Sequence, residues 1–286
     1  MGSEMCIRDR VRVQQVTGPT NQRIVFEYCQ LAAAAARAAT IRDVAWSGQS
    51  VTHGPVVEQA FTVMSEGRSV PGLYWQPDID PARHLILLGH GGTTHKKADY
   101  IELIAHLLVR KGLAAMAIDG PGHGERETAK PIGEDYDLFA ELWETDGGTA
   151  GITADWSTAL DFIEGEVGQQ TIGWWGVSMG TMMGVPFAAT DSRVQAAVMG
   201  LMGNWGPNKV DLMTMAPDVL CPLRFLVQWD DEMVPTENCI ELFDKIGSAE
   251  KSMHVNQGLH AAIPPHEVES SLNFLDHHLS KLNTAT

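Results

Sequence analysis

The sequence has few of the features that mark metal-binding or nucleotide-binding proteins. Its four cysteines are scattered without a Cys-x-x-Cys pair, which is typical of reduced thiols and predicts a cytoplasmic protein. No group of residues has metal-site spacing, and the glycines at 120, 122 and 124 lack the rest of a dinucleotide-binding pattern. We therefore expect neither a metal nor a cofactor.

Long apolar runs and basic clusters are also missing. No stretch approaches the roughly 20 apolar residues of a membrane helix, and the first residues lack the apolar segment of a secretory signal. The formal net charge of −16 disfavours nucleic acid and anionic membranes as partners. By contrast, a hydrophobic content of 44% over 286 residues is ample for one large core. These properties predict a single enzyme domain with a small-molecule substrate and leave a homodimer open.

The N-terminal part differs from the rest of the chain. Residues 1–10 resemble a translated sequencing adaptor of the kind found in metagenomic assemblies, and we expect them to be non-native; the alternative is a short native N-terminal tail. Residues 11–55 are expected to form a helical extension, with a helix over 21–40. The main domain is expected to span 56–286.

Strands and helices alternate along that domain, which predicts a mostly parallel, doubly wound α/β sheet with helices on both faces. The ranges 56–64 and 70–75 are expected to form a leading antiparallel pair. Further strands are expected at 84–89, 113–119, 171–175, 194–200, 223–229 and 251–255, and helices at 99–111, 154–165, 179–189, 236–246 and 264–282.

The most informative stretch is Gly-Val-Ser-Met-Gly at 176–180, which matches G-x-S-x-G directly after an apolar run. Small residues follow it and predict a helix. Strand, sharp turn and helix form the context in which a serine is presented as a nucleophile at a helix N-terminus. Ser178 is therefore the candidate nucleophile, and the alternative is an ordinary helix N-cap.

Two further residue types follow Ser178 in the order needed to activate it. The strand at 223–229 ends at Asp230 and Asp231, and the strand at 251–255 precedes His260. A serine hydroxyl is a weak nucleophile, so an imidazole must take its proton and a carboxylate must orient that imidazole. The order serine, aspartate, histidine favours a triad, and adjacent Asp230 and Asp231 both qualify as the acid.

Two glycine-rich turns complete a resemblance to the α/β-hydrolase superfamily that covers about residues 56–282. They are His-Gly-Gly at 90–92 and Asp-Gly-Pro-Gly-His-Gly at 119–124, each after an apolar strand. The resemblance implies an oxyanion hole made by the backbone N–H groups of Gly92 and Met179, with Thr93 as the alternative if the loop register shifts by one. It also selects Asp231 as the acid, since the family places that residue four positions before a proline, and it keeps Asp230 as the alternative.

The resemblance also implies an activity. The leading strands and the 119–124 turn are similar to the dienelactone-hydrolase-like and acyl-peptidase-like branches, although dienelactone hydrolases proper use a cysteine nucleophile. We expect a carboxylesterase-type serine hydrolase (EC 3.1.1) that cleaves small or medium esters through an acyl-enzyme on Ser178. An amidase or peptidase, a C–C bond hydrolase, an acyltransferase and a binding module without turnover are the alternatives.

Two short insertions are expected to form a small cap and to select the substrate. They cover 128–151 and 201–219, after predicted strands, where loops line the crevice of open α/β sheets. Their aromatic residues suit a hydrophobic acyl or aryl group, and we take Trp143 and Trp205 as candidate substrate-binding residues. The alternative is that both merely pack the cap onto the domain.

Overall fold

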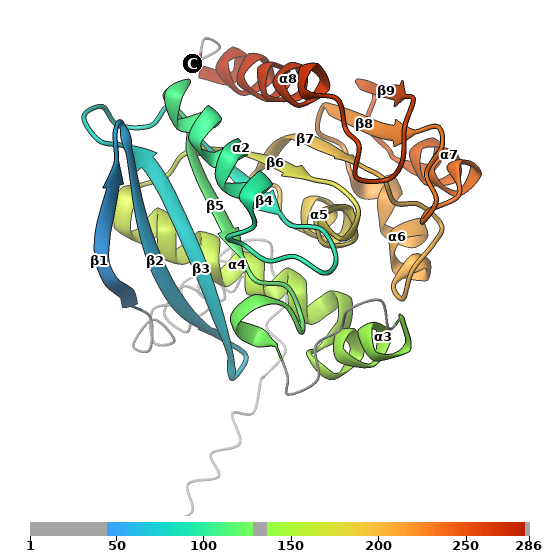
Figure 1. Cartoon of the computed structure of the whole chain (residues 1–286), viewed down its shortest axis with the longest axis horizontal. Coiled ribbons are helices and arrows are strands. Elements are labelled where there is room, and N and C mark those ends of the chain that lie inside the picture. Colours follow the sequence, from blue (N-terminus) through green and yellow to red (C-terminus); the bar gives the residue numbers. More distant parts are fainter. Residues whose placement is uncertain (1–44, 128–135, 284–286) are drawn as a thin grey trace, which may run out of the picture. The chain divides into compact units, whose positions relative to one another are not determined.

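A single twisted sheet runs through the part of the chain that the structure describes (Figure 1). The computed structural model describes residues 45–127 and 136–283, which belong to one compact unit. The strand order across the sheet is β1-β2-β3-β5-β4-β6-β7-β8-β9. The strands are β1 (Ala45–His53), β2 (Val56–Ser65), β3 (Arg68–Pro77), β4 (His84–Gly89), β5 (Ala114–Ile118), β6 (Thr171–Gly176), β7 (Val194–Gly200), β8 (Leu223–Gln228) and β9 (Lys251–Asn256).

The sheet has an antiparallel part and a parallel part. β1, β2, β3 and β5 pair antiparallel in that order. All pairs from β5 through β4 to β9 are parallel. The expected antiparallel pair and doubly wound parallel sheet are therefore confirmed.

Helices cover both faces of the parallel strands, which explains why those strands read as continuous apolar runs. β4 and β5 are buried at every residue. Successive side chains alternate between two cores: Leu85 and Leu87 join one, and Ile86 and Leu88 join the other.

The helices follow the same division. α2 and α8 supply residues to the core that contains Ile86, whereas α4 to α7 supply the core that contains Leu85 (Figure 1). The described helices are α2 (Asp99–Arg110), α3 (Tyr136–Thr145), α4 (Gly148–Val167), α5 (Met179–Thr190), α6 (Lys209–Met215), α7 (Thr236–Lys245) and α8 (Pro265–Asn283), with short 3₁₀ turns at Gly124–Arg126 and Ala216–Asp218. None of these described helices is long and apolar enough to cross a membrane.

The structure corrects two boundaries. The expected helical extension over 11–55 is wrong for its last part, because Ala45–His53 is strand β1 and pairs with β2. α4 begins at Gly148, before the expected residue 154, because packing of Ile152 in the core outweighs the low helix propensity of its first glycines. The two expected cap insertions contain helices α3 and α6. The predictions for residues 1–44, including the helix at 21–40, and for 128–135 lie outside the described residues.

A buried ion-pair network ties the antiparallel strands to the helical layer. Asp155 on α4 is fully buried. Its Oδ1 accepts from Arg68 of β3 at 2.9 Å, and its Oδ2 accepts from Arg126 at 2.8 Å. Arg126 also donates to the backbone oxygen of Asp119 at 3.0 Å. Because both carboxylate oxygens are paired, the charge is tolerated in the core.

Candidate active site

Ser178 lies in the sharp turn between β6 and α5. Its backbone adopts φ 59° and ψ −124°, a region that non-glycine residues rarely occupy and that costs about 1–3 kcal/mol. The Ser178 N–H donates to the carbonyl of Gly200 on β7 at 2.8 Å. The Ser178 hydroxyl makes no helix-capping bond, which argues against the N-cap alternative.

Close backbone approach explains the glycines around the serine. A Cβ at Gly180 would lie 2.4 Å from the backbone oxygen of Gly89, at the end of β4. A Cβ at Gly176 would lie 3.0 Å from the same atom. Only glycine allows the turn and the first residues of α5 to lie this close to β4. The loop that follows Gly89 therefore starts beside the serine turn.

Ser178, His260 and Asp231 lie in hydrogen-bond contact. His260 Nε2 is 2.9 Å from Ser178 Oγ, and His260 Nδ1 is 2.8 Å from Asp231 Oδ2. With the proton on Nδ1, the imidazole donates to the carboxylate and presents the Nε2 lone pair to the hydroxyl. This is the relation that a nucleophile, a base and an orienting acid require.

The surroundings of Asp231 keep it ionised. Its Oδ1 accepts from the backbone N–H groups of Met233 at 2.9 Å and Val234 at 2.8 Å. Burial favours the neutral acid, but the hydrogen bonds from His260, Val234 and Met233 outweigh it and hold the pKa of Asp231 below its ordinary value. A negative Asp231 is suited to stabilising the imidazolium that forms when His260 takes a proton.

Asp230 and Glu232 hold the loop that carries His260. Asp230 Oδ2 accepts from the Gly258 N–H at 3.3 Å, and the Asp230 N–H donates to the Gly258 carbonyl at 3.2 Å. Glu232 Oε2 accepts from the backbone N–H of His260 at 2.8 Å. Three successive acidic residues therefore make three different contacts to one loop. The sequence showed the acidic run but gave no signal for the contacts of Glu232.

The expected oxyanion donors are available. Among the described residues, the N–H groups of Gly92 and Met179 have no hydrogen-bond partner. Met179 is the first residue of α5, where N–H groups point out of the helix and favour negative charge. The alternative, Thr93, donates its N–H to His123 Nε2 at 3.1 Å. Thr93 is thus already engaged, which favours Gly92.

The two aromatic residues expected to bind substrate differ in exposure. Trp143 on α3 is 0% exposed and packs edge-on against Phe139, with ring centroids 6.0 Å apart. A substrate cannot reach it without rearrangement, so the structure contradicts direct binding by Trp143 and places it in the core that contains Leu85. Trp205 is 38% exposed and stays a candidate.

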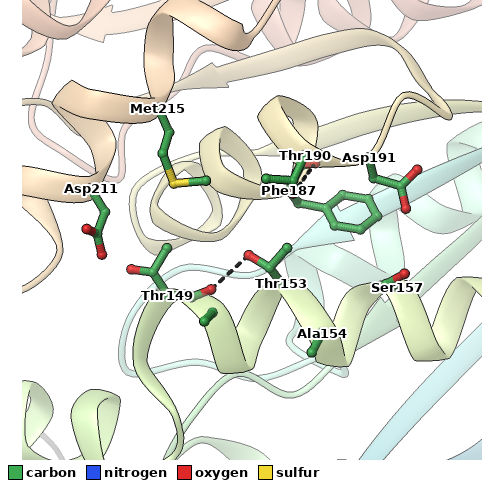
Figure 2. A pocket seen from close by; sticks show the side chains of 10 residues that line it. Thr149, Thr153, Ala154, Ser157, Phe187, Thr190, Asp191, Asp211 and Met215 are labelled. Carbon is green, nitrogen blue, oxygen red and sulfur yellow. Dashed lines mark hydrogen bonds between the residues drawn. The ribbon is translucent and has the colours of Figure 1, made fainter. Parts of the chain in front are cut away.

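A groove lies between α4, α5 and α6 (Figure 2). Its walls include Thr149 and Thr153 on α4 and Asp211 on α6. Phe187 and Thr190 also line it, from the C-terminal half of α5, whereas Ser178 precedes the first residue of that helix. The groove contains no triad residue. The described residues also contain no cluster of three or more histidine, cysteine or acidic side chains placed to hold a metal.

Comparisons with known proteins agree with this geometry. Residues 84–277 match the profile of the family described as alpha/beta hydrolase fold. The chain is 50% identical to the PEG-bound complex of a novel cold-adapted esterase from an Arctic intertidal metagenomic library, with a TM-score of 0.78 over 82% of this chain and 99% of that one. The native structure of such an esterase from the same kind of library is 45% identical, with a TM-score of 0.74 over the same shares.

A more distant likeness concerns the fold alone. Acetyl xylan esterase from Paenibacillus sp. R4 is 17% identical, with a TM-score of 0.65 over 93% of this chain and 97% of that one. No curated protein sequence matches the chain. The family match covers more than half of the sequence and includes all three triad residues, so the chain belongs to the α/β-hydrolase family.

Proposed function

We propose that the chain is a serine carboxylesterase that forms an acyl-enzyme on Ser178. The observation that carries the proposal is the continuous contact from Ser178 Oγ through His260 to Asp231, at 2.9 and 2.8 Å. The similarity to esterases at 45–50% identity supports an ester as the bond that is cleaved.

Acylation begins when Ser178 Oγ attacks the ester carbonyl and its proton passes to His260 Nε2. The carbonyl oxygen becomes an oxyanion, and the N–H groups of Gly92 and Met179 donate to it. One such donor typically contributes about 3–4 kcal/mol of barrier lowering. When the C–O bond breaks, His260 gives the proton to the leaving alcohol, and the acyl group stays on Ser178.

Deacylation repeats these steps with water. His260 takes a proton from the water as its oxygen attacks the acyl carbon, and the same two N–H groups receive the second oxyanion. Collapse of that intermediate returns the proton to Ser178 Oγ and releases the carboxylic acid. Asp231 remains ionised and orients His260 throughout.

Apolar side chains near the triad favour an uncharged ester of small or medium size. Trp229, Met233 and Leu259 are all exposed, and each lies within two residues of Asp231 or His260 in the sequence. Such side chains suit an alkyl or aryl group, whereas a net charge of −16 repels anionic esters. A cytoplasmic location and a homodimer stay predictions from the sequence.

Hydrolysis of p-nitrophenyl esters from acetate to decanoate tests the proposal, with Ser178→Ala as the control. We expect turnover that peaks at one chain length and falls to background in the variant. A folded wild-type protein that hydrolyses no ester, while a fluorophosphonate still labels Ser178, would replace the ester with an amide or C–C bond. Absence of labelling as well would contradict the catalytic role of Ser178 and favour a binding module.

A further inference from the structure

Four side chains surround the loop that carries Gly92. His90 belongs to the loop, Thr94 ends it, Tyr100 projects from α2, and His123 comes from the turn after β5. Each of them makes a hydrogen bond to the backbone of residues 91 to 93. We call them the loop clamp: His90, Thr94, Tyr100 and His123.

Three successive peptide groups of the loop are each hydrogen-bonded to a side chain. The Gly91 N–H donates to Tyr100 Oη at 2.6 Å. The Gly91 carbonyl accepts from His90 Nδ1 and from Thr94 Oγ1, both at 2.8 Å. The Thr93 N–H donates to His123 Nε2 at 3.1 Å. Of the N–H groups in this run, only that of Gly92 has no partner among the described residues.

The direction of the Gly92 N–H follows from the planarity of its peptide. The Gly91 carbonyl and the Gly92 N–H belong to one trans peptide and point in opposite directions. Two donors on the carbonyl side therefore fix the N–H on the other side. A Cβ added at Gly92 would meet no atom within 4 Å, so there is open space beside the Cα of this residue.

The loop clamp contains a closed ring of hydrogen bonds. Gly91 N–H donates to Tyr100 Oη, which lies 3.3 Å from Thr94 Oγ1. Because Thr94 donates to the Gly91 carbonyl, the Tyr100 hydroxyl must donate to Thr94. Each hydroxyl in the ring both accepts and donates a hydrogen bond, and the successive hydrogen bonds of such a chain strengthen one another. Burial raises the pKa of Tyr100, which keeps its hydroxyl protonated.

The two histidines connect the loops after β4 and β5 reciprocally. His90 Nε2 accepts from the Gly120 N–H at 2.8 Å, while His123 accepts from Thr93 of the other loop. His123 Nδ1 in turn donates to the Pro121 carbonyl at 2.7 Å. Both rings must therefore be neutral and carry their proton on Nδ1.

Burial supports the neutral state of both rings. Burial and the neighbouring His123 lower the pKa of His90, and the negative charge of Asp119 offsets this only in part. Burial lowers the pKa of His123, and the negative charges of Asp119 and Glu127 offset this only in part. Neutral rings can act as acceptors toward N–H groups throughout the neutral pH range.

We infer that the loop clamp positions the Gly92 N–H to receive the oxyanion. Its members are positioning residues, because they act on the loop backbone and need not touch the substrate. The inference rests on the proposed function insofar as the oxyanion arises from an ester carbonyl. It assigns a shared role to Thr94, Tyr100 and His123, which belong to three separate segments.

Variants that each remove one hydrogen-bonding group test the clamp. Thr94→Val and Tyr100→Phe open the hydrogen-bond ring, and His123→Leu removes the acceptor of the Thr93 N–H. We expect each to lower kcat about tenfold with KM nearly unchanged, because an oxyanion donor acts on the transition state. Thr94→Ser and His123→Gln keep the donor and the acceptor and should restore most of kcat.

A matched control removes the same type of bond elsewhere. Thr153 Oγ1 donates to the Thr149 carbonyl at 2.8 Å on α4, in the groove that contains no triad residue (Figure 2). Thr153→Val should leave kcat unchanged. Binding of a trifluoromethyl ketone, which forms an oxyanion on Ser178, should weaken in Thr94→Val by the same factor as kcat/KM. Equal kcat in Thr94→Val and Thr153→Val, or unchanged inhibitor affinity, would overturn the inference.

Amide hydrogen exchange tests the clamp without any turnover. In the wild-type protein, the amides of Gly91 and Thr93 should be protected and that of Gly92 should exchange faster. His123→Leu should expose Thr93, and Tyr100→Phe should expose Gly91. Fast exchange at all three amides of the wild-type protein would refute the clamp, whereas failure of ester turnover with this pattern intact would refute only the proposed function.

Discussion

Gly180→Ala is the most direct test of the contact between α5 and β4. The added Cβ would lie 2.4 Å from the Gly89 oxygen and 3.0 Å from the Gly89 carbonyl carbon. Ordinary contacts begin near 3.4 Å, so helix and strand must separate by about 1 Å. Such overpacking costs about 1–3 kcal/mol, while alanine regains about 0.5–1 kcal/mol of helix propensity. We expect a net loss of about 1–2 kcal/mol in the free energy of unfolding.

The same shift should affect catalysis, because Met179 moves with α5 and Gly92 with the loop after Gly89. A misplacement of about 1 Å can reduce a rate by about 100-fold. We therefore expect kcat/KM to fall by about 10- to 100-fold on the best p-nitrophenyl ester. Urea unfolding and steady-state kinetics on one preparation measure both effects.

Gly165→Ala is the matched control in α4. An added Cβ there meets nothing within 4 Å, and Gly165 has no positive φ. The substitution should raise the free energy of unfolding by about 0.5–1 kcal/mol and leave kcat/KM unchanged. If Gly180→Ala were as stable and as active as Gly165→Ala, the close approach of α5 to β4 would not constrain the site.

Three further predictions concern charged and titratable groups. Asp231→Asn should lower kcat by about 10⁴-fold through the wrong imidazole tautomer, whereas Asp230→Asn should cost only a few-fold; equal losses would refute the assignment of the acid. Urea unfolding should show lower stability at pH 5 than at pH 7. His90 and His123 have lowered pKa values and stay neutral when folded, so below about pH 6.5 the unfolded chain binds more protons, worth up to about 1.4 kcal/mol per pH unit per histidine. Asp155→Ala should destabilise by about 1–3 kcal/mol, because Arg68 and Arg126 each lose a buried carboxylate partner but keep Glu66 and Asp146, and a native melting temperature would contradict this.

The parallel half of the fold was predictable because its signals are local. β4, β5 and β6 are nearly continuous apolar runs. Such runs are typical of strands in a sheet that is covered by helices on both faces, because neither face meets water. β1 was not predicted because its residues are nearly all exposed, so they carry no hydrophobic pattern. Its pairing with β2 is decided by backbone hydrogen bonds, which the sequence does not show.

Candidate site residues were predictable where they belong to a motif that proteins of this fold share. Ser178 and His260 follow from their positions at strand ends, whereas chain order left both Asp230 and Asp231 as the acid and the family resemblance selected Asp231. Trp143 was misinterpreted because an aromatic side chain in a cap looks the same in sequence whether it faces a substrate or the core. The contacts of Tyr100 and Glu232 depend on tertiary geometry, and no spacing rule relates either of them to its partner.

The contact between Ser178 and Gly200 has a consequence for protein design. The serine turn depends on a neighbouring strand, so a nucleophile of this kind cannot be moved into another sheet by its own turn alone. The Gly200 carbonyl accepts a hydrogen bond from the Ser178 N–H, and the Gly200 N–H donates to Thr181 Oγ1 at 2.8 Å. Gly200 has φ 136°, and a Cβ there would lie 2.1 Å from the Leu226 oxygen of β8. A graft of the pentapeptide at 176–180 alone would therefore lack its anchor. The smallest portable unit is β6 with its turn and α5, next to a strand that ends in glycine.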